Sequence, residues 1–128
     1  MKYKTITTIS AILTLLNAIS FLFFPEFSLS LLGRTTNLVG IMNTRISGAC
    51  ALGLGIWTWS ARNTKFQDVR RIVYIGNITT FGVLIFVDLY GILESAINEL
   101  GWLIFFIDLL IFTGFISSIF TYGGGKQR

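Results

Sequence analysis

Four long apolar runs dominate the pattern of hydrophobic and polar positions along the chain. They cover about residues 5–24, 38–61, 71–93 and 101–122, with short polar connections between them. A helix of about twenty residues, rising 1.5 Å per residue, crosses the hydrocarbon core of a bilayer. The sequence therefore predicts an all-α protein, an integral membrane four-helix bundle that forms a single four-span domain over residues 1–128.

The first run is predicted to end at Pro25. Proline has no backbone N–H to donate, and it disfavours helical geometry in the residue before it. The segment that follows, Glu26 to Gly33, is too short to span a bilayer, but its leucines and phenylalanine suit a short helix at the membrane interface. Gly33 is expected to end that helix.

A cleaved signal peptide is the competing interpretation of the first run, because Lys2 and Lys4 precede it. No small-residue cleavage site follows the apolar stretch, however, and Phe24 and Pro25 stand where one would be expected. We therefore interpret the run as a retained span.

Basic residues divide unequally between the two sides of the predicted bundle. One side has only Arg34, and the other has Lys2, Lys4, Arg62, Lys65, Arg70, Arg71, Lys126 and Arg128. Loops rich in lysine and arginine stay in the cytoplasm. We therefore predict a multi-pass protein of the cell inner (plasma) membrane with both termini cytoplasmic.

Composition narrows the chemistry further. The net charge of +4 mostly reflects the uneven division of basic residues, so we expect contact with the lipid bilayer and no nucleic-acid partner. A single cysteine, Cys50, excludes an internal disulfide and a multi-cysteine metal site, and the lack of histidine excludes histidine-ligated haem or zinc and a Ser-His-Asp triad. No cofactor, metal site or catalytic residue is predicted.

Three ionisable residues fall inside the predicted spans: Arg45, Asp88 and Asp108. Each costs roughly 2.5 to 3.5 kcal/mol at the centre of a membrane helix, so such residues usually face the protein interior in pairs. Counted from the nearest span boundary, all three lie roughly 8 to 11 Å below the outer surface, and Asn17 reaches the same depth. We therefore predict a buried polar cluster of Asn17, Arg45, Asp88 and Asp108.

The predicted cluster leaves its function open. One arginine and two aspartates have a net charge of −1 when all three are ionised. Either one aspartate is therefore protonated, or a cation or hydrogen-bonding ligand completes the site. Our first hypothesis is that the cluster binds a small polar or ionic ligand as a step in transport. The alternative is an accessory or scaffold subunit of a larger membrane complex, in which the ion pair only fixes helix register. A membrane enzyme with Asp88 or Asp108 as general base is the third class, and nothing marks a nucleophile for it.

Small and polar residues indicate how the helices pack. Ser10 shares a helical face with Asn17, and we favour packing over a water-filled path as its role. Ser47, Ala51 and Gly55 recur every fourth position, which permits close approach to another helix. That helix belongs either to the same chain or to a partner in a homo-oligomer.

Several short segments carry a resemblance to a known group of proteins. They are Phe24-Pro25-Glu26-Phe27, Leu31-Leu32-Gly33, Arg45-Ile46-Ser47-Gly48-Ala49 and Gly53-Leu54-Gly55-Ile56-Trp57. Together they resemble small uncharacterised four-span bacterial membrane proteins of the broad DoxX-like type. The resemblance implies the four-helix fold without an established activity, and it carries over no catalytic residue.

Overall fold

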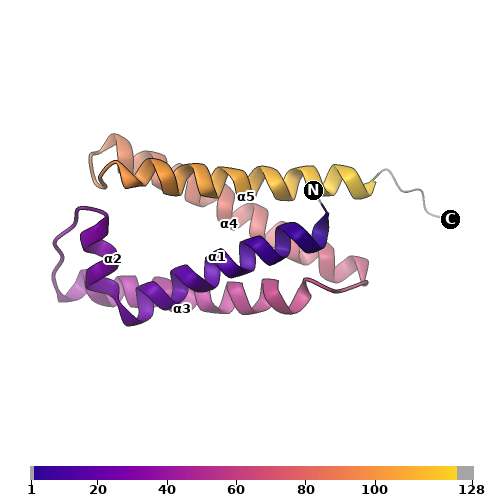
Figure 1. Ribbon diagram of the computed structural model, residues 1–128, viewed down its shortest axis with the longest axis horizontal. Helices are drawn as coiled ribbons and strands as arrows, with labels where there is room; N and C mark the ends of the chain where they lie inside the picture. The colour runs from indigo at the N-terminus through magenta and orange to yellow at the C-terminus, as the bar shows by residue number, and fades with distance from the viewer. Residues whose placement is uncertain (1, 124–128) are drawn as a thin grey trace.

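The computed structural model describes residues 2–123, and side chains over residues 2–120. Five helices make up the described chain, and it contains no strand (Figure 1). They are α1 (Tyr3–Phe23), α2 (Pro25–Leu31), α3 (Leu38–Ala61), α4 (Gln67–Leu93) and α5 (Leu100–Gly123). The four long helices are long and apolar enough to cross a membrane. The regular structure of the described chain is therefore all helical, and its four long helices suit a small multi-pass membrane bundle.

The signals that ended the first run act as the sequence predicts. α1 ends at Phe23, and Pro25 opens α2 at its first helical position, where the missing N–H of proline leaves no intrahelical bond unmade. Gly33 follows α2 with a φ of 76°, a left-handed conformation that glycine adopts without a steric penalty. A short helix thus follows the first span, and its position at the membrane interface stays a prediction.

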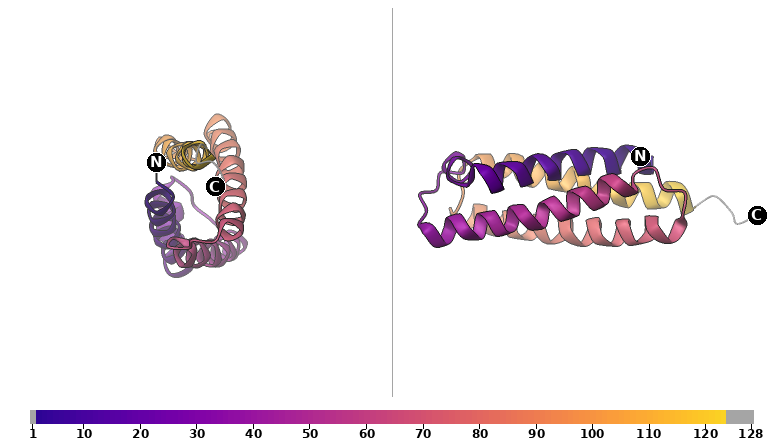
Figure 2. Two further views of the ribbon diagram at one scale, coloured as in Figure 1. Left: turned by 90° about the vertical axis from the view of Figure 1, so that its right-hand side faces the viewer. Right: turned by 90° about the horizontal axis from the view of Figure 1, so that it is seen from below.

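The long helices associate in two pairs, α1 with α3 and α4 with α5 (Figures 1 and 2). Within the first pair, α3 presents Gly48 and Gly55 to α1. A Cβ atom added at Gly55 would lie 2.8 Å from Leu15, and one at Gly48 would lie 3.0 Å from Leu22. These two glycines therefore let the two backbones approach closely.

The small-residue face that we predicted on this helix is only partly right. Gly55 lies in the contact with α1, but Ser47 is exposed and Gly48 takes the position in the contact. Residues 47 and 48 differ by about 100° around a helix, and the sequence pattern alone did not distinguish their two faces.

The two pairs meet at the end of the bundle that holds the N-terminus and the α3–α4 loop, which we call the N-terminal end (Figure 1). Tyr3 donates a hydrogen bond from its hydroxyl to the carbonyl oxygen of Ala61 at 3.1 Å. Tyr74 packs edge-on against both Tyr3 and Phe115, with ring centroids 5.4 Å and 6.1 Å apart. Two clusters of buried apolar side chains lie here and a few turns further in; they contain Tyr3, Ala61 and Val73, and Ile6, Phe81, Ile111 and Phe115.

The opposite end of the bundle, which we call the α2 end, is joined through its loops. The backbone N–H of Asn98 donates to the carbonyl oxygen of Leu32 at 3.1 Å, and its side-chain amide donates to that of Leu31 at 2.8 Å. Asn98 stands between α4 and α5, and Leu31 and Leu32 stand at the end of α2. A polar contact between loops thus ties the pairs together at this end.

Candidate functional site

A buried polar network joins α1, α3 and α4 near the N-terminal end. Asn77 of α4 is only 2% exposed. Its side-chain oxygen accepts a hydrogen bond from Ser10 at 3.1 Å, and its side-chain nitrogen donates to Thr58 at 3.1 Å and to the carbonyl oxygen of Val73 at 3.0 Å. Both donor hydrogens of the amide and its oxygen are thus engaged. Ser10 serves packing between helices, as the sequence analysis favoured.

A pair of acidic side chains lies further along α4, between α4 and α5. The carboxyl groups of Asp88 and Asp108 are within hydrogen-bonding reach of each other. Asp108 is 9% exposed, and Asp88 is half-buried. The structure therefore brings together two of the four residues that the sequence predicted to form one cluster.

The acid pair is incompletely satisfied. The Oδ2 atom of Asp88 is buried and has no hydrogen-bond partner. A buried polar atom without a partner costs about 1 to 3 kcal/mol. Two carboxylates side by side also repel each other strongly in a low-dielectric medium unless a proton or another cation lies between them.

Arg45 does not join the acid pair, which corrects our prediction of a four-residue cluster. Its side chain is exposed, and over the described residues it makes no hydrogen bond or ion pair with either aspartate. Thr58 marks the face that α3 turns toward α4, since it bonds Asn77. Arg45, thirteen residues earlier, lies about 140° away from Thr58 around the helix. Counting residues along the sequence predicts the depth of these residues in the membrane, but it does not predict which way each one faces around its helix axis.

Asn17 has a different placement from the other three residues. It lies seven residues after Ser10, on the same face of α1, yet its side chain is exposed. Leu84, on the face of α4 that carries Asp88, is also 36% exposed. Figure 1 shows the two helix pairs diverging toward the α2 end. Inward-facing side chains of α1 and α4 are therefore uncovered at this level, whereas they are buried at the level of Asn77.

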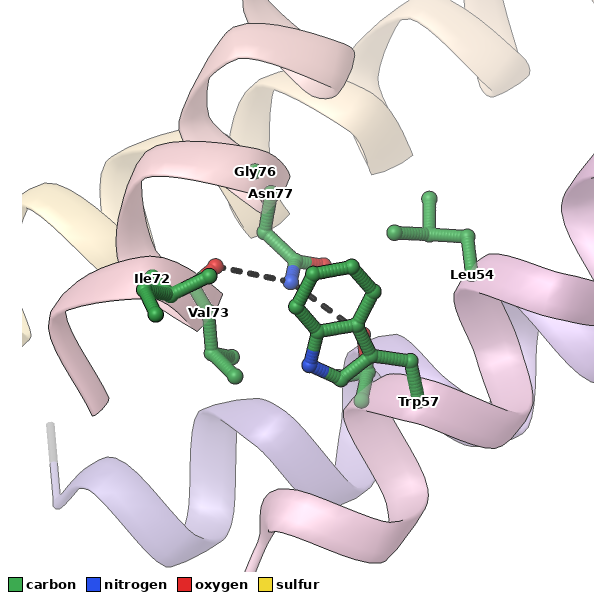
Figure 3. Close-up of a pocket in the computed structure, with 7 residues that line it drawn as sticks. Leu54, Trp57, Ile72, Val73, Gly76 and Asn77 are labelled. Carbon is green, nitrogen blue, oxygen red and sulfur yellow. Dashed lines mark hydrogen bonds between the residues drawn. The ribbon is translucent and has the colours of Figure 1, made fainter. Parts of the chain in front are cut away.

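A small groove between α3 and α4 is a feature that the sequence analysis missed. It is lined by Leu54, Trp57, Thr58, Ile72, Val73, Gly76 and Asn77 and has an empty volume of about 190 Å³ (Figure 3). The contribution of Trp57 to a groove wall depends on the contact between α3 and α4, which no pattern along one helix reveals.

No group of three or more histidine, cysteine, aspartate or glutamate residues arranged to hold a metal occurs over residues 2–123. Asp88 and Asp108 alone can supply two carboxylate groups to a cation. The remaining ligands of such a cation would come from water or from the ligand itself.

Comparison with known proteins gives a family and no function. The family model of a domain of unknown function, DUF8292, matches residues 1–122. No match is found among curated proteins, and none among solved structures. These comparisons show no link to DoxX-like proteins and no bacterial origin, so that resemblance stays a prediction.

Proposed function

The chain belongs to the DUF8292 family, and we propose from its geometry that it binds a small polar or ionic ligand, preferably a cation, at Asp88 and Asp108 as a step in transport. The ligand would lie between the two helix pairs, next to the α4–α5 contact. The proposed site contains two acidic residues, instead of the four polar residues predicted from the sequence.

The observation that carries this proposal is the unsatisfied oxygen of Asp88. A structural polar group inside a membrane protein normally finds a partner, as Asn77 does on the same helix. Asp88 Oδ2 is buried without one, beside a second carboxyl group and without a basic side chain in contact over the described residues. A cation or a hydrogen-bond donor placed here would satisfy the oxygen and offset the repulsion between the carboxylates.

The divergence of the helix pairs supports a route to this site. Asn17 and Leu84 are exposed on inward faces at the level where the pairs separate. A ligand could therefore reach the acid pair from the α2 end, where the side chains along its path include the amide of Asn17.

Cation-dependent stability tests the proposal. The purified protein in lipid nanodiscs is heated in sodium, potassium or methylammonium chloride, with N-methylglucamine chloride as the bulky reference salt. A ligand that binds only the folded state raises the midpoint of thermal unfolding. We expect at least one small cation to raise it for the wild type and not for Asp108→Asn.

Asp68→Asn is the matched control, because Asp68 is an exposed acid in the first turn of α4. It should keep the response of the wild type. If no cation, including a proton supplied by lowering the pH, affects the wild type more than Asp108→Asn, the acid pair is not a ligand site. Uptake of the responding cation into proteoliposomes then distinguishes transport from binding alone.

A specific observation also favours the second candidate function, that of an accessory or scaffold subunit. Arg45 lies within a helix long enough to span the membrane, is exposed, and has no ion-pair partner over the described residues. A charge in this position is costly against lipid, and an acidic residue on another transmembrane helix would compensate it. Arg45→Met should then abolish a larger complex on native gels while leaving cation binding unchanged.

We also propose the orientation predicted from the basic residues, in the plasma membrane of a bacterium with both termini cytoplasmic. A cysteine introduced at Lys65, in a Cys50→Ala background, should not react with an impermeant maleimide added to intact cells. A cysteine at Arg34, on the opposite side, should react. The reverse pattern would overturn the proposed orientation, but it would not affect the acid pair.

A further inference from the structure

The groove between α3 and α4 is open toward the surroundings of the bundle. Trp57 is 53% exposed and Ile72 is 51% exposed, one on each helix (Figure 3). Between them lies Gly76, where an added Cβ atom would meet nothing within 4 Å. Because α3 packs mainly on α1 and α4 mainly on α5, the surfaces that these two helices turn to each other remain partly uncovered.

The two buried polar side chains of the groove, Asn77 and Thr58, bond to each other. The nitrogen of Asn77 donates to Thr58 and Val73, and its oxygen accepts from Ser10. An apolar occupant therefore breaks none of these bonds, and a hydrogen-bond acceptor would find no free N–H on Asn77. Both helices that form the groove are candidate membrane spans, so the apolar molecules that reach it are lipid chains.

The charges around the groove favour one class of lipid. The N-terminal end carries six basic residues in the described chain against the acidic residue Asp68; the basic residues are Lys2, Lys4, Arg62, Lys65, Arg70 and Arg71. Arg62 is held close to the end of α3, with its guanidinium 3.7 Å from the centre of the Trp59 ring. Such a cluster attracts the phosphate of an anionic headgroup.

The distance between the basic residues and the groove matches the distance between the phosphate and the acyl chains of a phospholipid. Trp57 lies five residues before Arg62, or about 7 Å along the helix axis. A phosphate at the level of the α3–α4 loop would thus have its first acyl carbons at the level of Trp57 and Ile72.

We infer that this groove is a binding site for an anionic phospholipid, with one acyl chain lying over Gly76 between Trp57 and Ile72 and the phosphate next to Arg62 and Lys65. The site is separate from the acid pair of α4 and α5. It deepens the general expectation of lipid contact by naming the helices, the headgroup charge and the chain position.

Quenching of tryptophan fluorescence by brominated lipid tests the inference. Trp59→Phe and Trp102→Phe leave Trp57 as the only tryptophan. Phosphatidylglycerol brominated on its acyl chain is added to the protein in micelles, and phosphatidylcholine with the same chains serves as the neutral probe. We expect saturable quenching and an apparent affinity about fivefold higher for phosphatidylglycerol for each protein cation beside the headgroup, because each contributes about 1 kcal/mol of attraction to a net anionic headgroup and phosphatidylcholine carries a compensating choline cation.

Two pairs of variants separate the acyl contact from the headgroup contact. Gly76→Leu fills the groove and should abolish saturable quenching, whereas Gly53→Leu should not, although a Cβ at Gly53 likewise meets nothing within 4 Å. Arg62→Gln combined with Lys65→Gln should remove most of the preference for phosphatidylglycerol, whereas Arg34→Gln should keep it. Circular dichroism and elution as a single species establish that each variant is folded.

The outcomes that contradict the inference are distinct. Equal quenching by the two lipids would show only the general lipid layer around the bundle. Quenching that survives Gly76→Leu would place the chain elsewhere. Because the acid pair lies outside the groove, Asp108→Asn should leave every one of these lipid measurements unchanged, whether or not it abolishes cation binding.

Discussion

Asn77 and Asp88 lie on the same face of α4, about three turns apart, yet the two side chains have opposite environments. Asn77 is almost fully buried and bonds to groups on α1, α3 and α4. Asp88 contacts Asp108 of α5 and keeps a buried oxygen without a partner. The comparison shows that polar residues with the same helical periodicity divide into one layer whose hydrogen bonds join three helices and one layer in which a buried oxygen has no partner.

The position of the helices explains the difference. At Asn77 the two helix pairs meet, so α1 and α3 supply Ser10 and Thr58. At Asp88 the pairs have diverged, and Asn17 of α1 is exposed instead of covering α4 (Figure 1). Only the neighbouring α5 therefore supplies a partner.

The largest expected effect on stability comes from removing the hydrogen bonds of Asn77. Asn77→Leu leaves the hydroxyls of Ser10 and Thr58 without their partner in the bundle and should lower the free energy of unfolding by about 2 to 3 kcal/mol. Equilibrium unfolding in mixed micelles measures this loss. Adding Ser10→Ala and Thr58→Val should restore most of the stability. A triple variant as unstable as Asn77→Leu would show that the shape of these side chains, rather than their hydrogen bonds, stabilises this part of the bundle.

A substitution in the pair of Asp88 and Asp108 is expected to change stability in the opposite direction. Asp88→Asn removes one negative charge beside Asp108 while keeping the size of the side chain, so it should raise the free energy of unfolding by about 1 kcal/mol in a salt without a binding cation. The same unfolding assay measures the change. A loss of stability as large as that of Asn77→Leu would mean that Asp88 and Asp108 stabilise the packing of the helices, as Asn77 does.

The smallest effect is expected for Arg45→Met. Because Arg45 is exposed and does not contact either aspartate, the substitution breaks no buried pair and should change the stability of the isolated chain by less than about 1 kcal/mol. A loss of about 3 to 5 kcal/mol, typical of a broken buried ion pair, would place Arg45 with the acids after all. Arg34→Met provides the reference for a charge lost outside the spans.

The fold could be predicted from the sequence because its signals act within single helices. The helices α3 and α4 end at Ala61 and Leu93, where the apolar runs end, and Pro25 and Gly33 set the bounds of α2. Each of these boundaries follows from local hydropathy or from the backbone of one residue.

The site could be predicted only in part because it depends on how the helices are rotated and packed against one another. The depth of Arg45, Asp88 and Asp108 follows from counting residues, and two of these residues do meet. Which face of α3 turns inward depends on the packing of Gly48 and Gly55 against α1. A difference of one residue in that packing rotates Arg45 by about 100°, which is enough to move it from one environment to another.

The two hydrogen bonds of Asn98 have a consequence for how often the bundle opens. They tie the α2–α3 loop to the α4–α5 loop, whereas the other end of the bundle is joined by packed tyrosine and phenylalanine rings. Two net bonds of about 1 kcal/mol each would leave roughly a few per cent of molecules with this tie released at any moment. The two helix pairs would then separate at the α2 end and stay joined at the N-terminal end, so that the fraction of molecules with this tie released sets how often the α2 end of the bundle opens.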